Sequence, residues 1–294
     1  MKLRLRNRTL SLEGGRPLLM GIVNTSRDSV ADPVRLRTVE EQHAAALEMR
    51  ADGAAIIDVG GDSGRTDRAP RAVEEELGNV VPLVERLVGD GITVSVDTFK
   101  PPVAEAAVAA GATLINDVSG LADPAMAELA ADSGAGLVLM HTRAAPKEAA
   151  FPHYEDPVVE VLEFLSERMR LALDLGVHPE QIVVDPGPDY AKTPRESIEI
   201  LRRLPELAAL GRPILLAVSR KYFIGALTDR PPDDRLAGTL AAIGAGVDAG
   251  ATILRVHDVS HVARFLRVRG ALLGLDDEIP DYRDEERLKW LPAG

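Results

Sequence analysis

The sequence predicts an α/β protein of the (β/α)8 barrel class, and three of its features point to that fold. Short segments rich in β-branched and aliphatic residues alternate with longer amphipathic segments along the chain. The short segments are hydrophobic along nearly their whole length, as in parallel sheets that are buried on both faces. Eight such segments, each with its own helix, match a closed barrel better than an open doubly wound sheet, which usually has fewer strands.

The elements follow one another without a break. The first predicted strand reads LLMGIVN and the second AAIIDVG. The predicted strands are 18–24, 54–60, 93–98, 113–118, 136–142, 181–187, 214–220 and 252–259. The predicted helices lie near 39–52, 72–89, 101–110, 124–133, 157–175, 196–210, 235–249 and 261–273. Glycines that suit a left-handed cap, such as Gly53, Gly111, Gly134 and Gly176, close several of the helices.

The chain reads as one domain over residues 1–294, with the barrel core at about 17–274. Its 46% hydrophobic content is enough for one large core, and no linker or change in composition divides it. An acidic tail at 275–294, which contains Trp290, lies outside the repeats. We therefore expect a single barrel followed by a C-terminal extension.

Composition excludes several classes of function. Cysteine is absent, so disulfides, thiolate metal sites and cysteine nucleophiles are excluded. The formal charge of −12 argues against nucleic acid or an anionic membrane surface as the main partner. No apolar run reaches the roughly 18 residues that span a bilayer, and MKLRLRNRTLSLEGG lacks the apolar centre of a signal peptide. We expect a soluble, cytoplasmic protein.

Every predicted strand ends in polar residues, and the carboxyl ends of barrel strands form the active-site face of this fold. Each residue alone has a structural explanation, because an Asp or Thr after a strand often caps the next helix, as Asp97 and Thr98 would. Together they predict a polar pocket. The strand-end residues are Asn24, Asp58, Asp97, Asn116, Asp117, His141, Asp185, Ser219, Arg220, Lys221, Arg255 and His257.

Two subsets of these residues indicate different parts of a ligand. Arg65, Lys221, Arg255 and His257 are cationic or basic groups gathered at one face of an acidic protein, a pattern typical of phosphate or diphosphate binding. The competing interpretation is that these groups form internal salt bridges with Asp58, Asp97 and Asp185. The second subset, Asp97, Asn116 and Asp185, combines two acceptor carboxylates with an amide and would suit the edge of a flat heterocycle.

A metal is only weakly indicated. Asn24, with Asp28 or Asp32 nearby, offers oxygen ligands of the kind that Mg²⁺ accepts while it keeps waters and bridges substrate phosphates. There is no zinc pattern. The histidines on expected helices and loops are better explained as surface residues: His43, His153, His178 and His261.

From about Pro17 to about Gly274 the chain resembles the dihydropteroate synthase family. SRKYFIG together with RVHDV is the most specific part of the resemblance. The motifs, in the family's order, are MGIVNTSRDS, IIDVGGDSGR, VDT, INDVSG, LMHT, VDPG, KT, SRKYFIG, GTLAA and RVHDV.

The resemblance implies a (β/α)8 barrel, usually homodimeric, that joins 6-hydroxymethyl-7,8-dihydropterin diphosphate to 4-aminobenzoate and releases diphosphate on the route to folate. It assigns the pterin to the residues matching Asp97, Asn116, Asp185 and Lys221, with Met140 packing nearby. It assigns the diphosphate to the residues matching Asn24, Arg65, Arg255 and His257, with Mg²⁺. The implied reaction resembles an SN1 displacement, in which cations and the metal stabilise the leaving group while Asp97 and Asp185 support the cationic ring; the catalytic residues are Asp97, Asp185, Lys221 and Arg255.

The departures from the family pattern lie on the 4-aminobenzoate side. In the first loop Arg27 and Val30 stand where the family has proline and phenylalanine, and in the second loop Gly64 and Thr66 replace threonine and proline. After the sixth predicted strand, Asp189 and Tyr190 replace glycine and phenylalanine. Ser219 is assigned to the same side. A carboxylate at position 189 would repel that of 4-aminobenzoate by on the order of 1 kcal/mol, a repulsion that Arg27 would offset.

Two explanations of these departures remain open. The chain is either a folate-pathway synthase with a drifted arylamine pocket, or a paralogue that uses another nucleophile or has lost turnover. Two other classes are weighed beside them. A methyltransferase that uses methyltetrahydrofolate would share the barrel but has no use for Arg255 and His257 as a diphosphate cradle. A non-catalytic pterin-binding protein would bind pterin without releasing diphosphate.

Overall fold

The computed structural model describes residues 1–12, 15–25, 38–62, 64, 66–275 and 279. Its centre is a parallel sheet of eight strands in the order β8-β7-β6-β5-β4-β3-β10-β9. A parallel bridge between Val184 and Ile214 joins the two end strands and nearly closes the sheet. The strands are Leu18–Asn24 (β3), Ala54–Gly60 (β4), Val94–Asp97 (β5), Leu114–Asp117 (β6), Gly136–Met140 (β7), Ile182–Asp185 (β8), Leu215–Leu216 (β9) and Ile253–Val256 (β10).

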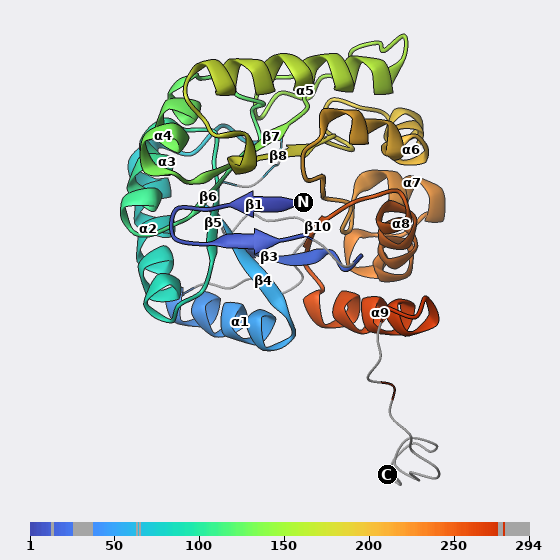
Figure 1. The fold of residues 1–294 in the computed structure, drawn as a ribbon, viewed down its shortest axis with the longest axis horizontal. Coiled ribbons are helices and arrows are strands. Elements are labelled where there is room, and N and C mark those ends of the chain that lie inside the picture. Colours follow the sequence, from blue (N-terminus) through green and yellow to red (C-terminus); the bar gives the residue numbers. More distant parts are fainter. Residues whose placement is uncertain (13–14, 26–37, 63, 65, 276–278, 280–294) are drawn as a thin grey trace, which may run out of the picture.

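The helices run around the outside of this barrel in chain order, which confirms the predicted (β/α)8 class (Figure 1). The α-helices of the described residues are α1 (Val39–Ala51), α2 (Val73–Gly89), α3 (Pro101–Ala109), α4 (Ala125–Ser133), α5 (Pro157–Asp174), α6 (Pro194–Arg202), α7 (Tyr222–Thr228), α8 (Leu236–Asp248) and α9 (Val259–Leu272). None of the described helices combines the length and the apolar character that a membrane crossing requires.

Three elements differ from the sequence-based expectation. The expected helix at 196–210 is α6 followed by a 3-10 segment at Leu204–Leu210, since Pro205 cannot donate the backbone hydrogen bond that would continue the helix. The strand expected to reach residue 220 ends at Leu216. The short helix α7 follows it and was not predicted. The loop after β9 therefore carries a helix of its own before α8 begins.

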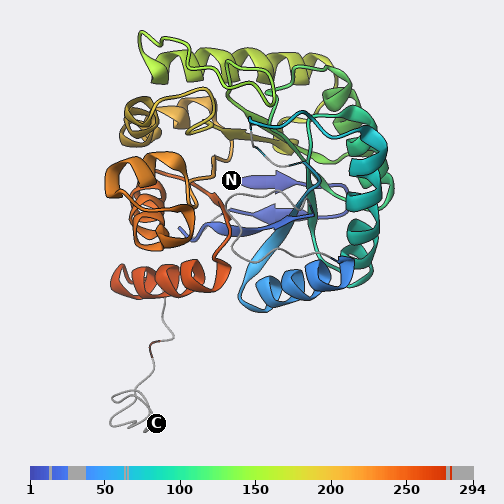
Figure 2. The same cartoon turned by 180° about the vertical axis from the view of Figure 1, so that it is seen from behind.

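A hairpin of β1 (Lys2–Arg4) and β2 (Thr9–Ser11) lies across one end of the barrel and was also not predicted (Figure 1). It lies behind the barrel in the reverse view (Figure 2). Leu3, Leu5 and Leu12 are buried from this side. They cluster with inward-facing strand residues such as Met20 and Ile253. The hairpin thus covers the end of the barrel opposite the strands' carboxyl ends, and leaves those ends for the site.

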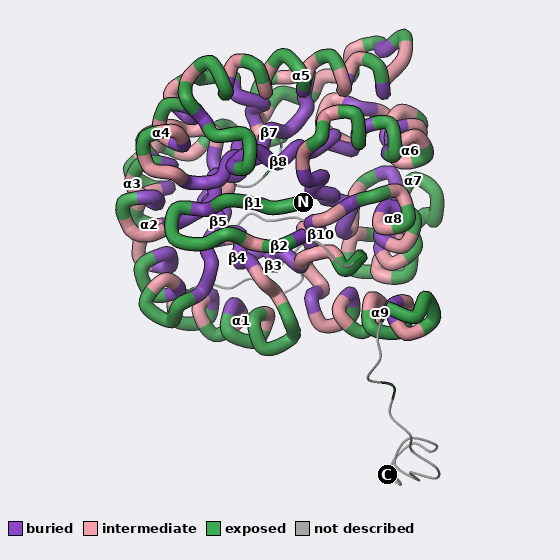
Figure 3. The backbone as a smooth tube through the Cα atoms, in the orientation of Figure 1, coloured by how far each residue is buried: buried purple, intermediate pink, exposed green. Residues whose placement is uncertain are grey.

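The larger hydrophobic cluster lies between the strands and the surrounding helices. Burial follows this layering, with buried strands inside and exposed outer helix faces (Figure 3). α2 shows the pattern clearly, because Val80, Leu83 and Leu87 are fully buried while its other face is exposed. Of the predicted acidic tail, only Leu275 and Ile279 belong to the described residues, and Trp290 lies outside them.

Candidate active site

A cavity of about 410 Å³ lies at the carboxyl ends of the strands. Apolar side chains such as Ile22 and Ala217 line it together with polar groups from several loops. Most of the predicted site residues border this one cavity. They are Asn24, Gly64, Asp97, Asp189, Tyr190, Ser219, Lys221, Arg255 and His257.

Three other predicted residues lie just behind this lining. Asn116, Met140 and Asp185 are at most 3% exposed and do not line the cavity. The sheet register places Asn116 beside Asp97 and Met140 beside Asp185. The proposed heterocycle clamp is therefore assembled by neighbouring strand ends. Arg27, Val30 and Arg65, together with Asp28 and Asp32, lie outside the described residues.

Arg255 is the centre of charge in the site. Its Nε donates to Asp58 Oδ2 at 2.6 Å, and its Nη2 donates to Asp97 Oδ2 at 2.5 Å. Asn116 Nδ2 also donates to Asp58 Oδ2, at 3.3 Å. For Arg255 the salt-bridge interpretation is thus confirmed. Because a guanidinium has five N–H donors, the two carboxylates orient it and still leave the donors of Nη1 for an anion.

Burial sets the charge states of the clamp. It raises the pKa of Asp97 to about 7; the Arg255 guanidinium opposes the shift, and nearby carboxylates including Asp58 add to it. Burial likewise raises the pKa of Asp185, which accepts from the backbone N–H of Gly187 at 2.8 Å. It also lowers the pKa of Lys221. Arg255 stays charged, since Asp58 and Asp97 raise its pKa against the opposing effect of burial.

Asp97 does not cap the helix that follows it. The N-cap residue of α3 is Lys100, which makes no side-chain capping bond. Thr98, not Asp97, bonds to the start of this helix, since its Oγ1 accepts from the Lys100 backbone N–H at 3.2 Å and donates to Glu76 Oε1 at 2.7 Å. The structural alternative for Asp97 is therefore excluded, and its carboxylate belongs to the cavity.

The loop after β8 is held by one buried lysine. Lys192 is 1% exposed, and its Nζ donates to the carbonyls of His141 at 3.2 Å, Gly187 at 2.8 Å and Tyr190 at 2.9 Å. Burial lowers its pKa to about 7. Three carbonyls match the three donors of an ammonium group. Gly187 is required for this close packing, because it has φ +60° and a Cβ there would collide with the His141 carbonyl.

Asp189 faces its own loop and α7 rather than standing free in the cavity. One carboxylate oxygen accepts from Ser197 Oγ at 3.1 Å and the other from the backbone N–H of Phe223 at 3.1 Å. Phe223 lies in the first turn of α7, where an Asp is favourable. With both oxygens engaged, this carboxylate has a structural role that the sequence did not reveal, and its repulsion of a ligand carboxylate is reduced.

Tyr190 links the clamp to the second loop. The Lys221 ammonium lies 4.1 Å from the centre of the Tyr190 ring, and Lys221 Nζ also donates to the Pro188 carbonyl at 3.0 Å. A Cβ built on Gly64 would lie 3.6 Å from the Tyr190 hydroxyl. The aromatic ring that replaces the expected phenylalanine therefore packs between Lys221 and the loop after β4.

The remaining predicted residues lie at the rim of the cavity. Ser219 Oγ accepts from the backbone N–H of His257 at 3.2 Å and lies 3.0 Å from its Nδ1. Asn24 ends β3 beside Gly60, where a Cβ on the glycine would lie 3.3 Å from Asn24 Oδ1. His257 is thus tied to the loop after β9, and Asn24 points toward the strand ends.

The described residues contain no group of three or more His, Cys, Asp or Glu side chains that could hold a metal ion. Asn24 offers one amide oxygen at the cavity. A single protein oxygen fits Mg²⁺ that is held mainly by phosphates and water, and does not fit a cage built by the protein.

Several residues that shape the site were not predicted from the sequence. Lys192 was noted only within a motif. The other missed residues form a charged network beneath the loop after β4: Asp62, Glu76, Lys100 and Lys147. Their signal was weak because each stands in a loop or helix far along the chain from its partners.

The barrel, its buried clamp and the basic groups at its rim define a pterin-binding enzyme. The family model described as "Pterin binding enzyme" matches residues 20–257. A dihydropteroate synthase of Bacillus subtilis is 40% identical over 88% of this chain and 89% of its own length. The chain belongs to the dihydropteroate synthase family, and it is an enzyme of the transferase class.

Solved structures agree with this assignment. A Xanthomonas albilineans dihydropteroate synthase with 4-aminobenzoic acid matches with a TM-score of 0.85 and 41% identity, over 95% of this chain and all of that one (100%). The same enzyme in complex with 7,8-dihydropteroate matches with a TM-score of 0.81 and 41% identity, over 94% of this chain and 100% of that chain. Both the fold and the family predicted from the sequence are confirmed.

Proposed function

We propose that this chain joins 6-hydroxymethyl-7,8-dihydropterin diphosphate to 4-aminobenzoate and releases diphosphate, the dihydropteroate synthase reaction of folate biosynthesis. The proposal rests on one observation: the polar clamp and the guanidinium of Arg255, which two carboxylates orient, meet at the same cavity. Asp97 and Lys221 line the cavity with Arg255, and Asp185 and Asn116 lie directly behind them.

In this proposal the clamp holds the pterin ring. Asp185 and Asp97 accept from ring N–H groups, and Asn116 supplies an amide that both donates and accepts. Lys221 donates to a ring acceptor while its ammonium remains against Tyr190. As the bond from the exocyclic carbon to the diphosphate oxygen breaks, its electrons leave with the diphosphate and positive charge spreads into the ring. The carboxylates of Asp97 and Asp185 stabilise that charge.

The leaving group is stabilised at the rim. Arg255 has donors beyond those that Asp58 and Asp97 engage, and we assign the diphosphate to it together with His257, Asn24 and Arg65. We propose that Mg²⁺ enters with the diphosphate, with Asn24 as its ligand from the chain; a bound Mg²⁺ would neutralise developing phosphate charge.

The arylamine nitrogen then forms a bond to the carbon that lost diphosphate, and the nitrogen releases one proton to water. We assign this amine to the part of the cavity lined by Gly64, Asp189, Tyr190 and Ser219, next to Lys221 of the clamp. We assign Arg27 and Val30 of the first loop to the same substrate. Positioning, rather than a strong base, supplies most of the acceleration. We also propose that the enzyme is a cytoplasmic homodimer, as the family resemblance implies.

The Xanthomonas albilineans relative supports 4-aminobenzoate over another nucleophile, because its solved structures are complexes with 4-aminobenzoic acid and with 7,8-dihydropteroate. The bonded carboxylate of Asp189 removes the main objection to an anionic arylamine. A methyltransferase would leave Arg255 and His257 without an anion to bind.

The direct test is turnover by the purified protein of the pterin diphosphate with 4-aminobenzoate, followed by release of diphosphate with and without Mg²⁺. We expect Mg²⁺-dependent formation of dihydropteroate. Binding of the pterin diphosphate with no product would contradict the proposed reaction and favour the paralogue. No loss of binding in Lys221→Ala would show that the cavity is not the site.

A further inference from the structure

The loop after β4 is closed at its base by one carboxylate. Asp62 Oδ2 accepts from the backbone N–H of Arg71 at 3.0 Å, so the two ends of the 62–71 segment are joined. Before this segment, Gly61 lies so close to α2 that a Cβ would meet Glu76 and Val80. The base of the loop is thus packed and hydrogen-bonded against the barrel.

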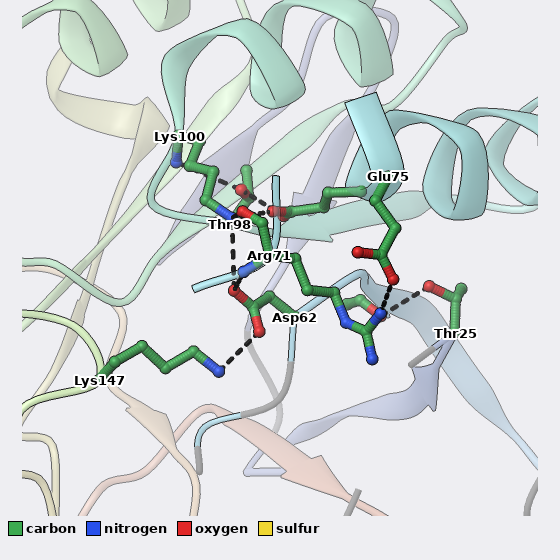
Figure 4. Close-up of polar contacts among 9 residues, drawn as sticks. Thr25, Asp62, Arg71, Glu75, Thr98, Lys100 and Lys147 are labelled. Carbon is green, nitrogen blue, oxygen red and sulfur yellow. Dashed lines mark hydrogen bonds and ion pairs between the residues drawn. The ribbon is translucent and has the colours of Figure 1, made fainter. Parts of the chain in front are cut away.

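Two lysines from other loops converge on the same carboxylate. Lys147, in the loop after β7, lies 2.6 Å from Asp62 Oδ1, and Lys100, at the start of α3, lies 3.3 Å from Asp62 Oδ2. Figure 4 shows Asp62 with Lys147 on one side and with Lys100 and Arg71 on the other. Lys100 also bonds to Glu76 at 2.5 Å and to the Arg71 carbonyl at 2.9 Å.

This network is shielded from solvent. The side chains of Asp62 and Lys147 are 6% and 7% exposed, and that of Glu76 is 0% exposed. Although burial acts in the opposite sense, the hydrogen bonds from Lys147 and Arg71 lower the pKa of Asp62. A shielded pair has a much larger effect on structure than an exposed one, because breaking it leaves the other charge buried and unpartnered.

The network stands at the wall of the cavity. Asp62 and Lys147 line the cavity, and so do Gly64 and Thr66 from the segment that Asp62 closes. Arg65 belongs to this segment in the sequence. The Lys147 backbone has φ +71°, an unfavourable value for a residue with a side chain, which the loop tolerates where it delivers the ammonium to Asp62.

We propose that Asp62 and Lys147 are positioning residues, and that their bridge ties the loop after β4 to the loop after β7 so that Gly64 and Thr66 are held at the cavity wall beside the reacting ligands. Neither residue contacts the reacting atoms in this proposal, which rests on the proposed function of the cavity. The bridge acts as a unit, because Lys147 and Asp62 form one ion pair and the loss of either partner breaks it.

The test is a double-mutant cycle with Asp62→Asn, Lys147→Met and the two together. Asn keeps an acceptor for the Arg71 N–H, so the change isolates the charge. We expect each single change to raise the KM of both substrates about 10-fold, with kcat changed less than about 3-fold, because substrates bind to a misplaced loop. The double variant should be no worse than either single one.

A second readout does not depend on turnover. Trypsin can cut after Arg65, Arg68 and Arg71, and Arg68 is exposed. We expect Asp62→Asn and Lys147→Met to speed cleavage in this segment by about 10-fold, as local opening becomes easier. The control is the Arg86–Glu40 pair, which joins α2 to α1 at 2.8 Å on the surface. Arg86→Met and Glu40→Gln should leave the KM values and the cleavage rate unchanged.

Multiplying effects in the double variant, or unchanged KM values and cleavage rates in the single ones, would overturn the proposal. A fall of kcat and thermal midpoint with constant KM would also overturn it, since that result indicates only structural damage. If the wild-type enzyme forms no product, the proposed reaction fails by itself. The trypsin rates still decide whether the bridge holds the loop.

Discussion

The floor and the rim of the cavity are fixed by different interactions. At the floor, strand register sets Asp97 beside Asn116 and Met140 beside Asp185. Asn116, Met140 and Asp185 are at most 3% exposed, and the Asp97 side chain, which reaches the cavity, is 15% exposed. At the rim, loops are held by lysines: Lys192 bonds to one carbonyl after β7 and to two in its own loop, and Lys147 bonds to Asp62 in the loop after β4. The floor therefore depends on the barrel itself, whereas the rim depends on a few side chains that need not touch a ligand.

The largest effect should come from the residue that joins floor and rim. Arg255→Ala removes N–H donors for the leaving group. It also leaves the fully buried Asp58 without its counter-charge, and Oδ1 of that carboxylate already has no hydrogen-bond partner among the described residues. We expect kcat to fall by about 10²–10³-fold. The free energy of unfolding should fall by about 3 kcal/mol. Steady-state kinetics and urea unfolding measure the two losses.

A second substitution separates those losses. Adding Asp97→Asn to Arg255→Ala removes one of the two stranded carboxylates, so part of the stability should return while turnover stays low. If the double variant regained turnover together with stability, the assignment of Arg255 to the diphosphate would be contradicted. Arg255 would then serve only to neutralise the two carboxylates.

The next effect concerns the rim. Lys192→Met leaves the carbonyls of His141, Gly187 and Tyr190 without their buried donor, at a cost of about 2–3 kcal/mol. Since this loop places Tyr190 against Lys221, we expect the KM for 4-aminobenzoate to rise about 10-fold. Kinetics with the arylamine as varied substrate measures the shift.

The chain offers a matched control for Lys192. Gln181 is 3% exposed, and its Nε2 donates to the carbonyls of Ala130 at 2.8 Å and Ala135 at 2.6 Å, beside the amino end of β8. Gln181→Met should lose similar stability and leave the KM unchanged. An equal rise in KM in both variants would show that general destabilisation, not loop position, causes it.

The floor should also respond to pH through Asp97. Its pKa is near 3.8 in the unfolded chain and about 7 in the folded one, so the folded protein binds the extra proton between these values. This contribution to stability is present at low pH and is lost as the pH rises through 7. From pH 5 to pH 8 the wild type should therefore lose on the order of 2 kcal/mol relative to Asp97→Asn. Urea unfolding at both values measures it, and a constant difference would contradict the raised pKa.

The difference between floor and rim also explains which parts of the site the sequence could predict. Asp97, Asn116 and Asp185 end hydrophobic strands, so periodicity alone placed them at one face of a barrel. The partners of Asp62 and Lys192 could not be predicted, since they depend on which loops meet in space. The hairpin β1–β2 was missed because its strands are three residues each, too short to give a clear alternating pattern. The helix α7 was missed because it is only seven residues long and begins inside the SRKYFIG motif.

The smallest effect should come from Asp189, the residue that raised the doubt about 4-aminobenzoate. Asp189→Asn can still accept from the Phe223 N–H and can donate to Ser197, so α7 keeps its cap. We expect the KM for 4-aminobenzoate to change less than about 2-fold, because a carboxylate engaged by two donors repels a ligand weakly. Free repulsion on the order of 1 kcal/mol would instead make the KM fall about fivefold in the variant. Asp189→Ala separates the two roles, since it should lose about 1 kcal/mol of stability with the cap whether or not the ligand is repelled.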